Sequence, residues 1–361
     1  MISIAAPEMD HEEKQRVQEV LDSGMLADGP EVREFEREFA DFCDTDHGVA
    51  TSNGTTALHT ALEALDIGDG DKVVTSPFSF VASANAIRLA GAEPIFADIE
   101  PETFNLDPNA VEEIVRERDV DAILAVHLYG LPADLSALQD IANDYDLAFV
   151  EDAAQAHGAE YDGQTVGSFG DVGCFSFYPT KNMTTGEGGM ITTDREDVAE
   201  KAASFANHGR SADGGYEHIR LGHNYRLTSV AAAIGRAQLE KLPEYVEARR
   251  ANASLLDRAL ANVNVTTPTE PDDRTHAYHQ YTIRADDRDG LAEFLEDAGV
   301  GTGIYYPTPI HEQPAYSHVE CGAPVAERLA DEVLSLPVHP GLSTADVETI
   351  TQAMLDYEAH R

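Results

Sequence analysis

The chain has 361 residues, a hydrophobic fraction of 42% and a formal net charge of −42. At about 100–200 residues per domain, this length predicts two domains, and the apolar content suffices for a buried core. Acidic side chains are spread along the whole sequence, so the surface would repel nucleic acids and anionic membranes. Neither is expected as a partner.

The same excess of acid indicates the salt conditions that suit the chain. Asp and Glu total 66 against 24 Lys and Arg, and so many like charges repel one another unless salt screens them. The composition resembles cytosolic proteins of salt-accumulating halophilic archaea; a merely acidic mesophilic enzyme is the alternative. The sequence lacks an apolar run of the ~20 residues that a membrane span requires and a signal-peptide start, which favours a cytoplasmic protein.

Short β-rich runs alternate with helical patterns over the first two-thirds of the chain. Helices are predicted at Glu12–Leu21, Val32–Phe42, Thr55–Leu65, Val81–Leu89, Pro108–Arg118 and Leu135–Asp144. Strands are predicted at Lys72–Ser76, Pro94–Asp98, Asp121–His127, Leu147–Glu151, Gly173–Phe177 and Gly189–Thr193. This alternation is typical of an α/β fold with a largely parallel sheet between helices.

A long helical pattern from about Thr228 to Ala261 ends this rhythm. A strand at Ala277–Arg284 and helices at Arg288–Ala298 and Ala345–Tyr357 are predicted after it. We therefore predict a large domain at residues 1–240, on which the N-terminal helices pack, and a small C-terminal α+β domain at residues 241–361.

The segment Ser52-Asn53-Gly54-Thr55-Thr56 follows a short apolar run and opens a predicted helix. Gly54 permits close approach of a ligand to the backbone, and the free amides of a helix start suit a phosphate. The Thr55 hydroxyl adds a donor. Ser, Asn and Thr are equally ordinary helix caps, and this segment alone favours the capping interpretation.

Asp152 follows the predicted strand Leu147–Glu151, at the strand end where open α/β sheets bind ligands. A carboxylate there can pair with a protonated pyridine nitrogen. A structural Asp that caps the next turn explains the residue equally well. His157, five residues on, is interpreted as structural.

Lys181 lies in the turn after the predicted strand Gly173–Phe177, in a chain with only five lysines. A lysine becomes nucleophilic when it is desolvated, because burial lowers its pKa. The other four lysines lie among acidic or polar residues and are interpreted as surface residues. An exposed loop lysine is the weaker alternative for Lys181.

Two later segments carry candidate polar residues. Asn224 and Arg226 lie in a turn before the long helix, where Thr228 would serve as an ordinary cap. The segment Gly303–His311 contains Tyr306, two prolines and a terminal His311, which suits either a rigid connection or a loop over a substrate. The spacing of the three cysteines predicts neither a metal site nor a disulfide.

Each segment alone is unspecific, but the ordered set strongly resembles the DegT-type nucleotide-sugar aminotransferases. The resemblance runs from Ser23-Gly24 to the segment Leu334–His339, nearly the whole chain. It implies the fold-type-I aminotransferase architecture, with a mostly parallel seven-stranded sheet between helices and a smaller C-terminal domain. It also implies pyridoxal 5'-phosphate as the cofactor, with the pyridoxamine phosphate form as an intermediate.

The resemblance assigns roles to individual residues. Lys181 matches the Schiff-base lysine, Asp152 the partner of the pyridine nitrogen, and Gln155 the residue beside the 3-hydroxyl. The remaining cofactor contacts are Gly54, Thr55 and Ser176 at the phosphate, Phe80 against the ring, and Asn224 supplied by the neighbouring subunit. A homodimer with shared active sites is therefore implied. At Tyr305 many relatives have His, so the sugar pocket departs from the family pattern.

The implied reaction transfers an amino group from glutamate to a keto-sugar nucleotide, for surface glycan or polysaccharide synthesis. The whole-chain pattern most resembles enzymes that act on a 3-keto uronic-acid sugar, with Arg226, Tyr306 and His311 as substrate contacts. A 4-keto-6-deoxy sugar nucleotide is the alternative acceptor. A cysteine-desulfurase-like enzyme, with Cys321 as its only candidate loop cysteine, and a non-catalytic cofactor-binding regulator are the alternative functions.

Overall fold

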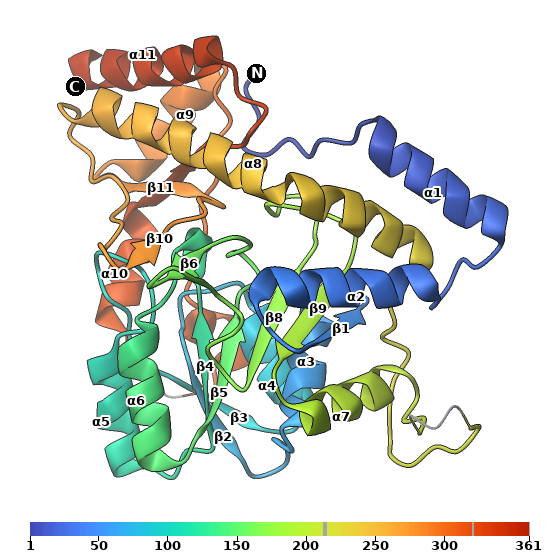
Figure 1. Ribbon diagram of the computed structural model, residues 1–361. Helices are drawn as coiled ribbons and strands as arrows, with labels where there is room; N and C mark the ends of the chain where they lie inside the picture. Colours follow the sequence, from blue (N-terminus) through green and yellow to red (C-terminus); the bar gives the residue numbers. More distant parts are fainter. Residues whose placement is uncertain (212–214, 320, 361) are drawn as a thin grey trace.

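A seven-stranded sheet forms the centre of the computed structural model, which describes residues 1–211, 215–319 and 321–360 (Figure 1). The strand order is β1-β9-β8-β5-β4-β2-β3. These strands are β1 (His47–Thr51), β2 (Lys72–Thr75), β3 (Glu93–Phe96), β4 (Ala122–Val126), β5 (Ala148–Asp152), β8 (Val172–Ser176) and β9 (Gly189–Thr193). Only β9 runs against its neighbours in this sheet. The predicted α/β fold with a mostly parallel sheet is confirmed.

Strand β1 is the member of this sheet that the sequence pattern did not predict. It pairs with β9 over its whole length, from His47 opposite Thr193 to Thr51 opposite Gly189. Its sequence, His-Gly-Val-Ala-Thr, has few β-favouring residues. Gly48 is required there because a Cβ atom would lie 2.4 Å from the Glu36 carbonyl oxygen. Close packing against α2 thus stabilises a strand whose residues have a low intrinsic preference for β structure.

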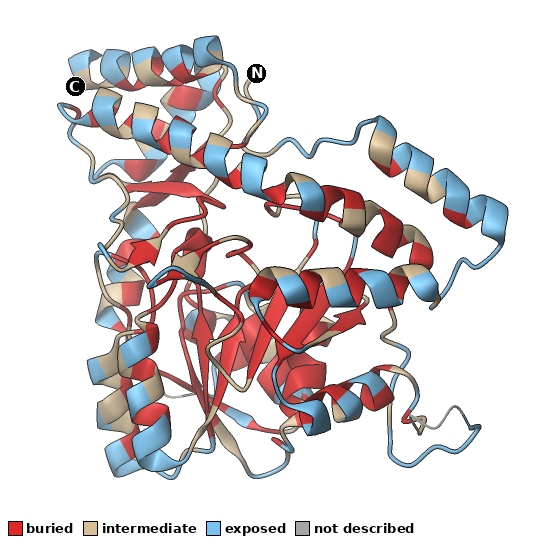
Figure 2. Cartoon of the chain, viewed as in Figure 1, coloured by how far each residue is buried: buried red, intermediate tan, exposed pale blue. Residues whose placement is uncertain are grey.

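Helices cover both faces of the sheet. One core cluster joins one face to α2 (Pro30–Cys43), α5 (Pro108–Glu117), α6 (Leu135–Tyr145) and the first half of α8 (Ser229–Leu260). The other cluster contains residues of α3 (Gly54–Ala64), α4 (Ala82–Leu89), α7 (Glu196–Ala206) and α10 (Pro324–Glu332). Figure 2 shows the resulting pattern, with buried strands and helices whose buried stripe faces the sheet. This layering leaves the carboxyl ends of the parallel strands at one edge.

The long helix α8 connects this layered region to a second core. Leu242 and Val246 pack with the sheet, whereas Ala253 and Leu256 belong to a cluster with the C-terminal elements. Those elements are β11 (Tyr281–Arg284), β12 (Val333–Leu336), α9 (Arg288–Asp297) and α11 (Thr344–His360). The two halves of α8 therefore belong to different hydrophobic cores. The predicted domain boundary at residue 240 stays a prediction.

The predicted strand Ala277–Arg284 is shorter in the structure, where only Tyr281–Arg284 pairs with β12. The preceding residues bond to another region: Ala277 N–H donates to Gly130 O, and Gln280 N–H donates to Tyr129 O. Short additional elements complete the fold: β6 (Glu160–Tyr161), β7 (Gln164–Thr165), β10 (Arg274–Thr275), η1 (Leu128–Gly130), η2 (Ile310–Glu312) and η3 (Pro314–Tyr316).

The N-terminal segment contacts the C-terminal elements first and then α8. Ile2 forms a β-bridge with Val300 beside α9, and α1 (His11–Ser23) then lies along α8 (Figure 1). Among the described residues, no helix combines the length and apolar character that crossing a membrane requires.

Candidate active site

Lys181 and Asp152 lie close enough to influence each other's charge, next to the ends of neighbouring strands β8 and β5. Burial lowers the pKa of Lys181 to about 8, although the Asp152 carboxylate opposes this shift. Burial raises the pKa of Asp152, while the Ser83 hydroxyl, the Ala154 amide and Lys181 oppose the rise. The predicted desolvation of Lys181 is therefore present. It yields an amine that is partly neutral near neutral pH.

The start of α3 lies against the end of β8 and has free amides. Asn53 caps this helix, since its side chain accepts from Thr56 N–H at 2.9 Å, so the capping interpretation is correct for these two residues. The amides of Gly54 and Thr55, at the first two helical positions, have no partner within the helix geometry. A Cβ atom at residue 54 would lie 2.7 Å from Ser176 Cβ. Only glycine lets the helix start approach the end of β8 so closely, which places the first turn of α3 beside the Ser176 hydroxyl.

Gln155 is buried and has side-chain partners on both ends of its amide. Its Oε1 accepts from Tyr129 N–H at 2.8 Å, and its Nε2 donates to the Tyr306 hydroxyl at 3.1 Å. The Tyr306 ring lies 6.2 Å from the exposed Phe80 ring. The structure therefore brings Gln155, Tyr306 and Phe80 together.

Asn224 and Arg226 lie on a strand-like segment beside β1, where Arg226 bridges to Thr51 and Asn224 to Asn207. Asn224 is exposed. Arg226 Nη1 donates to Asn207 Oδ1 at 2.7 Å, so its structural partner is an amide rather than a surface acid. Between them, Tyr225 stacks on His223 at 4.7 Å. Alternation along an extended segment places Asn224 and Arg226 on the face opposite these rings.

The side chain of His311 contacts Phe96 and α10. Its buried ring lies 6.3 Å from the Phe96 ring, and its Nε2 is 3.2 Å from a Glu327 carboxylate oxygen in α10. Its segment touches the loop after β2, because Ile310 N–H donates to Pro77 O. The ring contacts connect His311 to α10, and its role at a substrate stays a prediction.

The structure adds residues that the sequence analysis missed. Ser83 in α4 donates from Oγ to Asp152 Oδ2 at 2.7 Å. Asn182 Nδ2, next to Lys181, donates to Ala277 O at 3.0 Å and holds the lysine turn against the segment before β11. Neither residue has a recognisable local signal, because each acts through a partner that is distant in the sequence.

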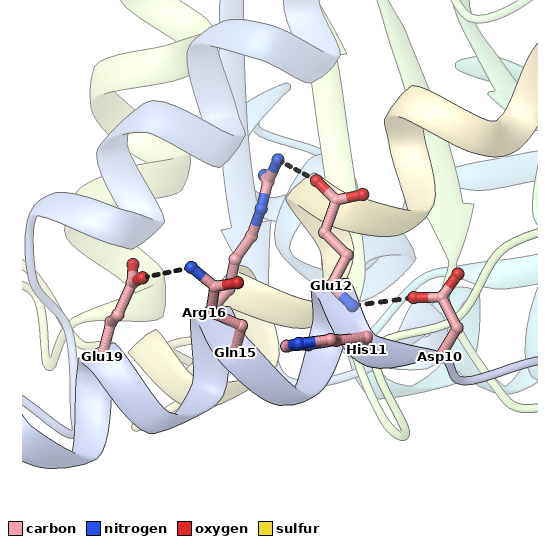
Figure 3. A pocket seen from close by; sticks show the side chains of 6 residues that line it. All are labelled: Asp10, His11, Glu12, Gln15, Arg16 and Glu19. Atoms are coloured by element: carbon pink, nitrogen blue, oxygen red, sulfur yellow. Dashed lines mark hydrogen bonds and ion pairs between the residues drawn. The ribbon is translucent and has the colours of Figure 1, made fainter.

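One open hollow elsewhere on the molecule contains none of these residues. It has a volume of about 650 Å³ and lies along α1, lined by Asp10, His11, Glu12, Gln15, Arg16 and Glu19 (Figure 3). Four of its polar side chains are paired with each other: Arg16 with Glu12 at 2.7 Å, and Gln15 with Glu19 at 3.1 Å. None of these lining residues lies at the end of a parallel strand, where open α/β sheets bind ligands.

Sequence comparison gives related proteins over nearly the full length. A "Pleiotropic regulatory protein" of Geobacillus stearothermophilus is 41% identical over 350 residues, which cover 95% of this chain and 93% of the relative. A UDP-2-acetamido-2-deoxy-3-oxo-D-glucuronate aminotransferase of Pseudomonas aeruginosa is 39% identical over 339 residues, 94% of each chain.

Structure comparison agrees. The crystal structure of Streptomyces venezuelae DesV in complex with a ketimine intermediate superposes with a TM-score of 0.93 at 37% identity, covering 96% of this chain and 94% of that one. Residues 7–355 match the DegT/DnrJ/EryC1/StrS aminotransferase family, whose enzymes depend on pyridoxal 5'-phosphate. The chain therefore belongs to this family of sugar aminotransferases that act on keto-sugar nucleotides.

Proposed function

We propose that the protein transfers an amino group from glutamate to a 3-keto uronic-acid sugar nucleotide, in the synthesis of a surface glycan. The observation that carries the aminotransferase chemistry is the partly neutral Lys181 amine beside the buried Asp152. The uronate is supported by the 39% identity to a 3-oxo-glucuronate aminotransferase.

The side chains present fit the cofactor in the proposed roles. When bound, pyridoxal phosphate supplies an electron sink for negative charge at the α-carbon of the donor. Lys181 would hold the cofactor through its ε-amine and, once released, carry a proton to and from that carbon. Asp152 would pair with the pyridine nitrogen. The Gly54 and Thr55 amides with Ser176 Oγ would bind the phosphate.

Gln155 and Phe80 would fix the ring in this arrangement. Gln155 is already held by Tyr129 N–H, so its remaining amide group is oriented toward the space beside Tyr306. Phe80 is exposed although it is large and apolar, which suits an aromatic side chain that covers a bound ring.

The acceptor's carboxylate would be bound by an arginine in the proposed assignment. Arg226 is the preferred contact because a bidentate guanidinium suits a carboxylate and its Nη1 contact is the neutral Asn207 amide. Tyr306 and His311 are assigned to the same substrate, Tyr306 with support from its contact to Gln155.

A homodimer with shared sites is also proposed. Asn224 would complete the phosphate site of the partner subunit, and its exposed position supports this role. Inactive Lys181→Ala and Asn224→Ala chains, mixed under conditions of subunit exchange, should regain about a quarter of wild-type activity by random pairing. Absence of recovery after demonstrated exchange would exclude the shared site.

The experiment on substrate uses the purified holoenzyme with glutamate and a panel of keto-sugar nucleotides. We expect amination of the 3-keto uronate, with Arg226→Lys raising KM for it about tenfold or more, as the loss of a bidentate pair implies. Borohydride reduction should fix the cofactor to the peptide that contains Lys181. A preference for a 4-keto-6-deoxy sugar, unaffected by Arg226→Lys, would favour the alternative acceptor.

The alternative functions have less support. A cysteine desulfurase needs a reactive thiolate, whereas burial, with Asp98 and Glu327 nearby, raises the pKa of Cys321 to about 11. A non-catalytic regulator has no need of the neutral amine at Lys181. Formation of 2-oxoglutarate from glutamate in the presence of a keto sugar separates both from the proposed enzyme.

A further inference from the structure

Asp152 is held by two donors from different elements. Its Oδ1 accepts from Ala154 N–H at 3.2 Å, within its own turn, and its Oδ2 accepts from Ser83 Oγ at 2.7 Å, across from α4. Two anchors on the two oxygens fix the rotation of the carboxylate. Since each carboxylate oxygen can accept two hydrogen bonds, each retains capacity for a further donor.

The direction of the hydroxyl protons follows from these contacts. Ser83 Oγ also lies 3.0 Å from Ser79 Oγ and 3.3 Å from Phe80 O. Ser83 carries one hydroxyl proton, and its shortest contact is the one to the carboxylate, which can only accept when ionised. Ser79 must then donate to Ser83. The result is a chain of two hydroxyls, each polarising the next, that ends at Asp152.

The two hydroxyls and the carboxylate at their end are buried. Ser79 and Ser83 have 4% and 1% of their surface exposed, and Asp152 has 5%. In such surroundings a hydrogen bond to a charged group is strong, and its loss leaves the partner without solvent to replace it. Burial alone raises the pKa of Asp152, and Ser83 gives the largest opposing contribution.

We propose that Ser83, supported by Ser79, is a positioning residue that holds Asp152 ready to bind the pyridine nitrogen of the cofactor. This inference rests on the proposed role of Asp152. Ser83 also receives part of its fixed position from Phe80, whose carbonyl accepts from Ser83 N–H at 3.2 Å. One serine therefore connects the carboxylate to the segment that carries the proposed covering ring.

The test measures the protonation of the cofactor directly. Holoenzyme is prepared with cofactor labelled with ¹⁵N in the pyridine ring, and the nitrogen chemical shift is recorded for wild type, Ser83→Ala and Ser79→Ala. The wild-type signal should be that of a protonated nitrogen. Ser83→Ala should move it toward the unprotonated position, and Ser79→Ala should move it less, because the direct donor remains.

Kinetics of the glutamate half-reaction provide the second measurement and do not depend on the sugar. Loss of a buried hydrogen bond to a charged group corresponds to about 10–100-fold, so Ser83→Ala should lower the rate constant by that factor. The KM for glutamate should change less than about twofold, since Ser83 acts through Asp152. Ser79→Ala should cost about 2–5-fold.

The outcomes separate three cases. An unchanged nitrogen signal in Ser83→Ala overturns the inference, whether activity is kept or lost, because only packing would then be affected. An unprotonated nitrogen in the wild type overturns the proposed role of Asp152 itself. If Ser83→Ala fails to fold, Ser83→Cys keeps the volume with a weaker donor, and Ser83→Thr keeps the hydroxyl. The signal must then shift in the first and stay near wild type in the second.

Discussion

The lowered pKa of Lys181 comes from its place in the fold and not from its neighbours in the sequence. The turn after β8 removes it from bulk water, and the effect of burial on its pKa exceeds the opposing effect of Asp152. Such a group destabilises the folded protein whenever it is charged. A cofactor-binding lysine should therefore reduce stability at neutral pH, as functional groups often do.

Lys181→Met in protein stripped of cofactor should raise the free energy of unfolding at pH 7 by roughly 1–3 kcal/mol. The folded pKa is about 8 against an ordinary value of 10.5, so between these values the unfolded chain binds more protons. The wild-type penalty is complete below about pH 8 and disappears as pH rises toward 10.5. Chemical denaturation at pH 7 and 10.5 in molar potassium chloride measures the difference.

The exposed Lys14 supplies the control for this prediction, because Lys14→Met removes the same charge from solvent. It should change stability by less than about 0.5 kcal/mol at either pH. If Lys181→Met is no more stable than wild type at pH 7, the lowered pKa is absent.

Residues of the site differ in how far sequence could predict them. Lys181 stood out in a lysine-poor chain, and Gly54 and Asp152 lie at strand or helix ends that bind ligands in this fold class. The proposed Schiff-base role of Lys181, and the proposed cofactor contacts of Gln155 and Phe80, came only from the ordered resemblance. Ser83 could not be predicted, because its function depends on a contact across 69 residues of sequence.

At the level of elements, the apolar patterns predicted six of the seven strands of the central sheet but missed β1 and the buried strand β12. Strand β9 has the predicted bounds, whereas β1 and β12 were missed. The buried strand β4 is an uninterrupted apolar run, which any pattern analysis detects. Strand β1 carries His47 and Gly48 and exists because β9 and α2 surround it.

A buried carboxylate network holds the strand ends that carry the site. Glu151 accepts from the amides of Gly167, Phe169 and Gly170, each at 2.8 Å, and lies 3.0 Å from His127 Nε2. Because Ala133 N–H donates to His127 Nδ1, the ring proton is on Nε2 and points to Glu151. Adjacent strands β4 and β5 are thus fixed next to Asp152.

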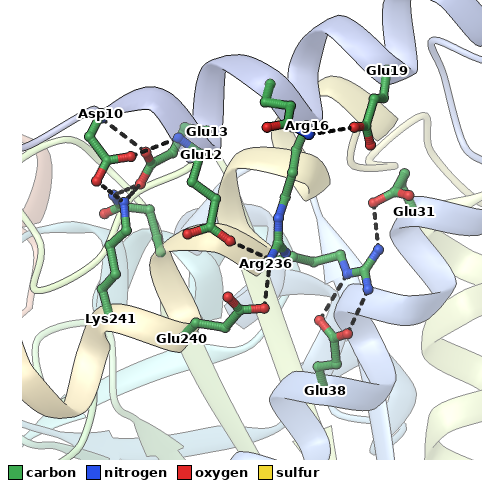
Figure 4. Close-up of polar contacts among 12 residues, drawn as sticks. Asp10, Glu12, Glu13, Arg16, Glu19, Glu31, Glu38, Arg236, Glu240 and Lys241 are labelled. Carbon is green, nitrogen blue, oxygen red and sulfur yellow. Dashed lines mark hydrogen bonds and ion pairs between the residues drawn. The ribbon is translucent and has the colours of Figure 1, made fainter.

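The contact of α1 with α8 depends on scarce cations (Figure 4). Lys241 Nζ lies 2.6 Å from Glu13, whose side chain is only 2% exposed, and 2.8 Å from Asp10. Gln238 Nε2 also donates to Glu13 at 2.6 Å. Without the lysine, a buried carboxylate would keep only neutral donors.

Lys241→Met should therefore lower the free energy of unfolding by about 1–3 kcal/mol, the usual effect of leaving a buried charge without its partner. Arg37→Met is the matched control: Arg37 pairs with Glu34 and Asp41, but its side chain is 59% exposed, so the loss should stay below about 1 kcal/mol. Denaturant titrations of the two variants give the comparison. Equal losses of stability in the two variants would mean that the buried contact of Lys241 with Glu13 contributes no more than the exposed ion pairs of Arg37.

The whole molecule carries 66 acidic and 24 basic side chains, and the structure shows where many of the basic ones are used. Arg236 binds Glu31 and Glu38, Arg16 binds Glu240, and Lys241 binds Glu13, all between helices, and Arg16 also binds Glu12 within α1 (Figure 4). Cations placed in these contacts are not available to neutralise the rest of the surface. The acidic excess therefore lies mainly on exposed positions, where only dissolved ions can screen it.

Stability should in consequence increase strongly with salt. Raising potassium chloride from 0.1 M to about 2 M shortens the screening length from about 10 Å to below about 3 Å, less than the spacing of most surface charges. We expect the melting temperature to rise by at least about 5 °C, which for a chain of this length corresponds to a few kcal/mol. Sucrose at matched osmolality is the control, since it favours compact states without screening charge.

A charge-reduced variant separates screening from other effects of salt. Glu293, Glu296 and Asp297 form an exposed acidic surface on α9, and replacing them with Gln, Gln and Asn removes three charges without touching a core side chain. If self-repulsion causes the salt dependence, this variant should be more stable than wild type at low salt and equal to it at 2 M. Equal stability at both concentrations, or a melting temperature of the wild type that ignores potassium chloride, would show that the net charge of −42 does not limit the fold.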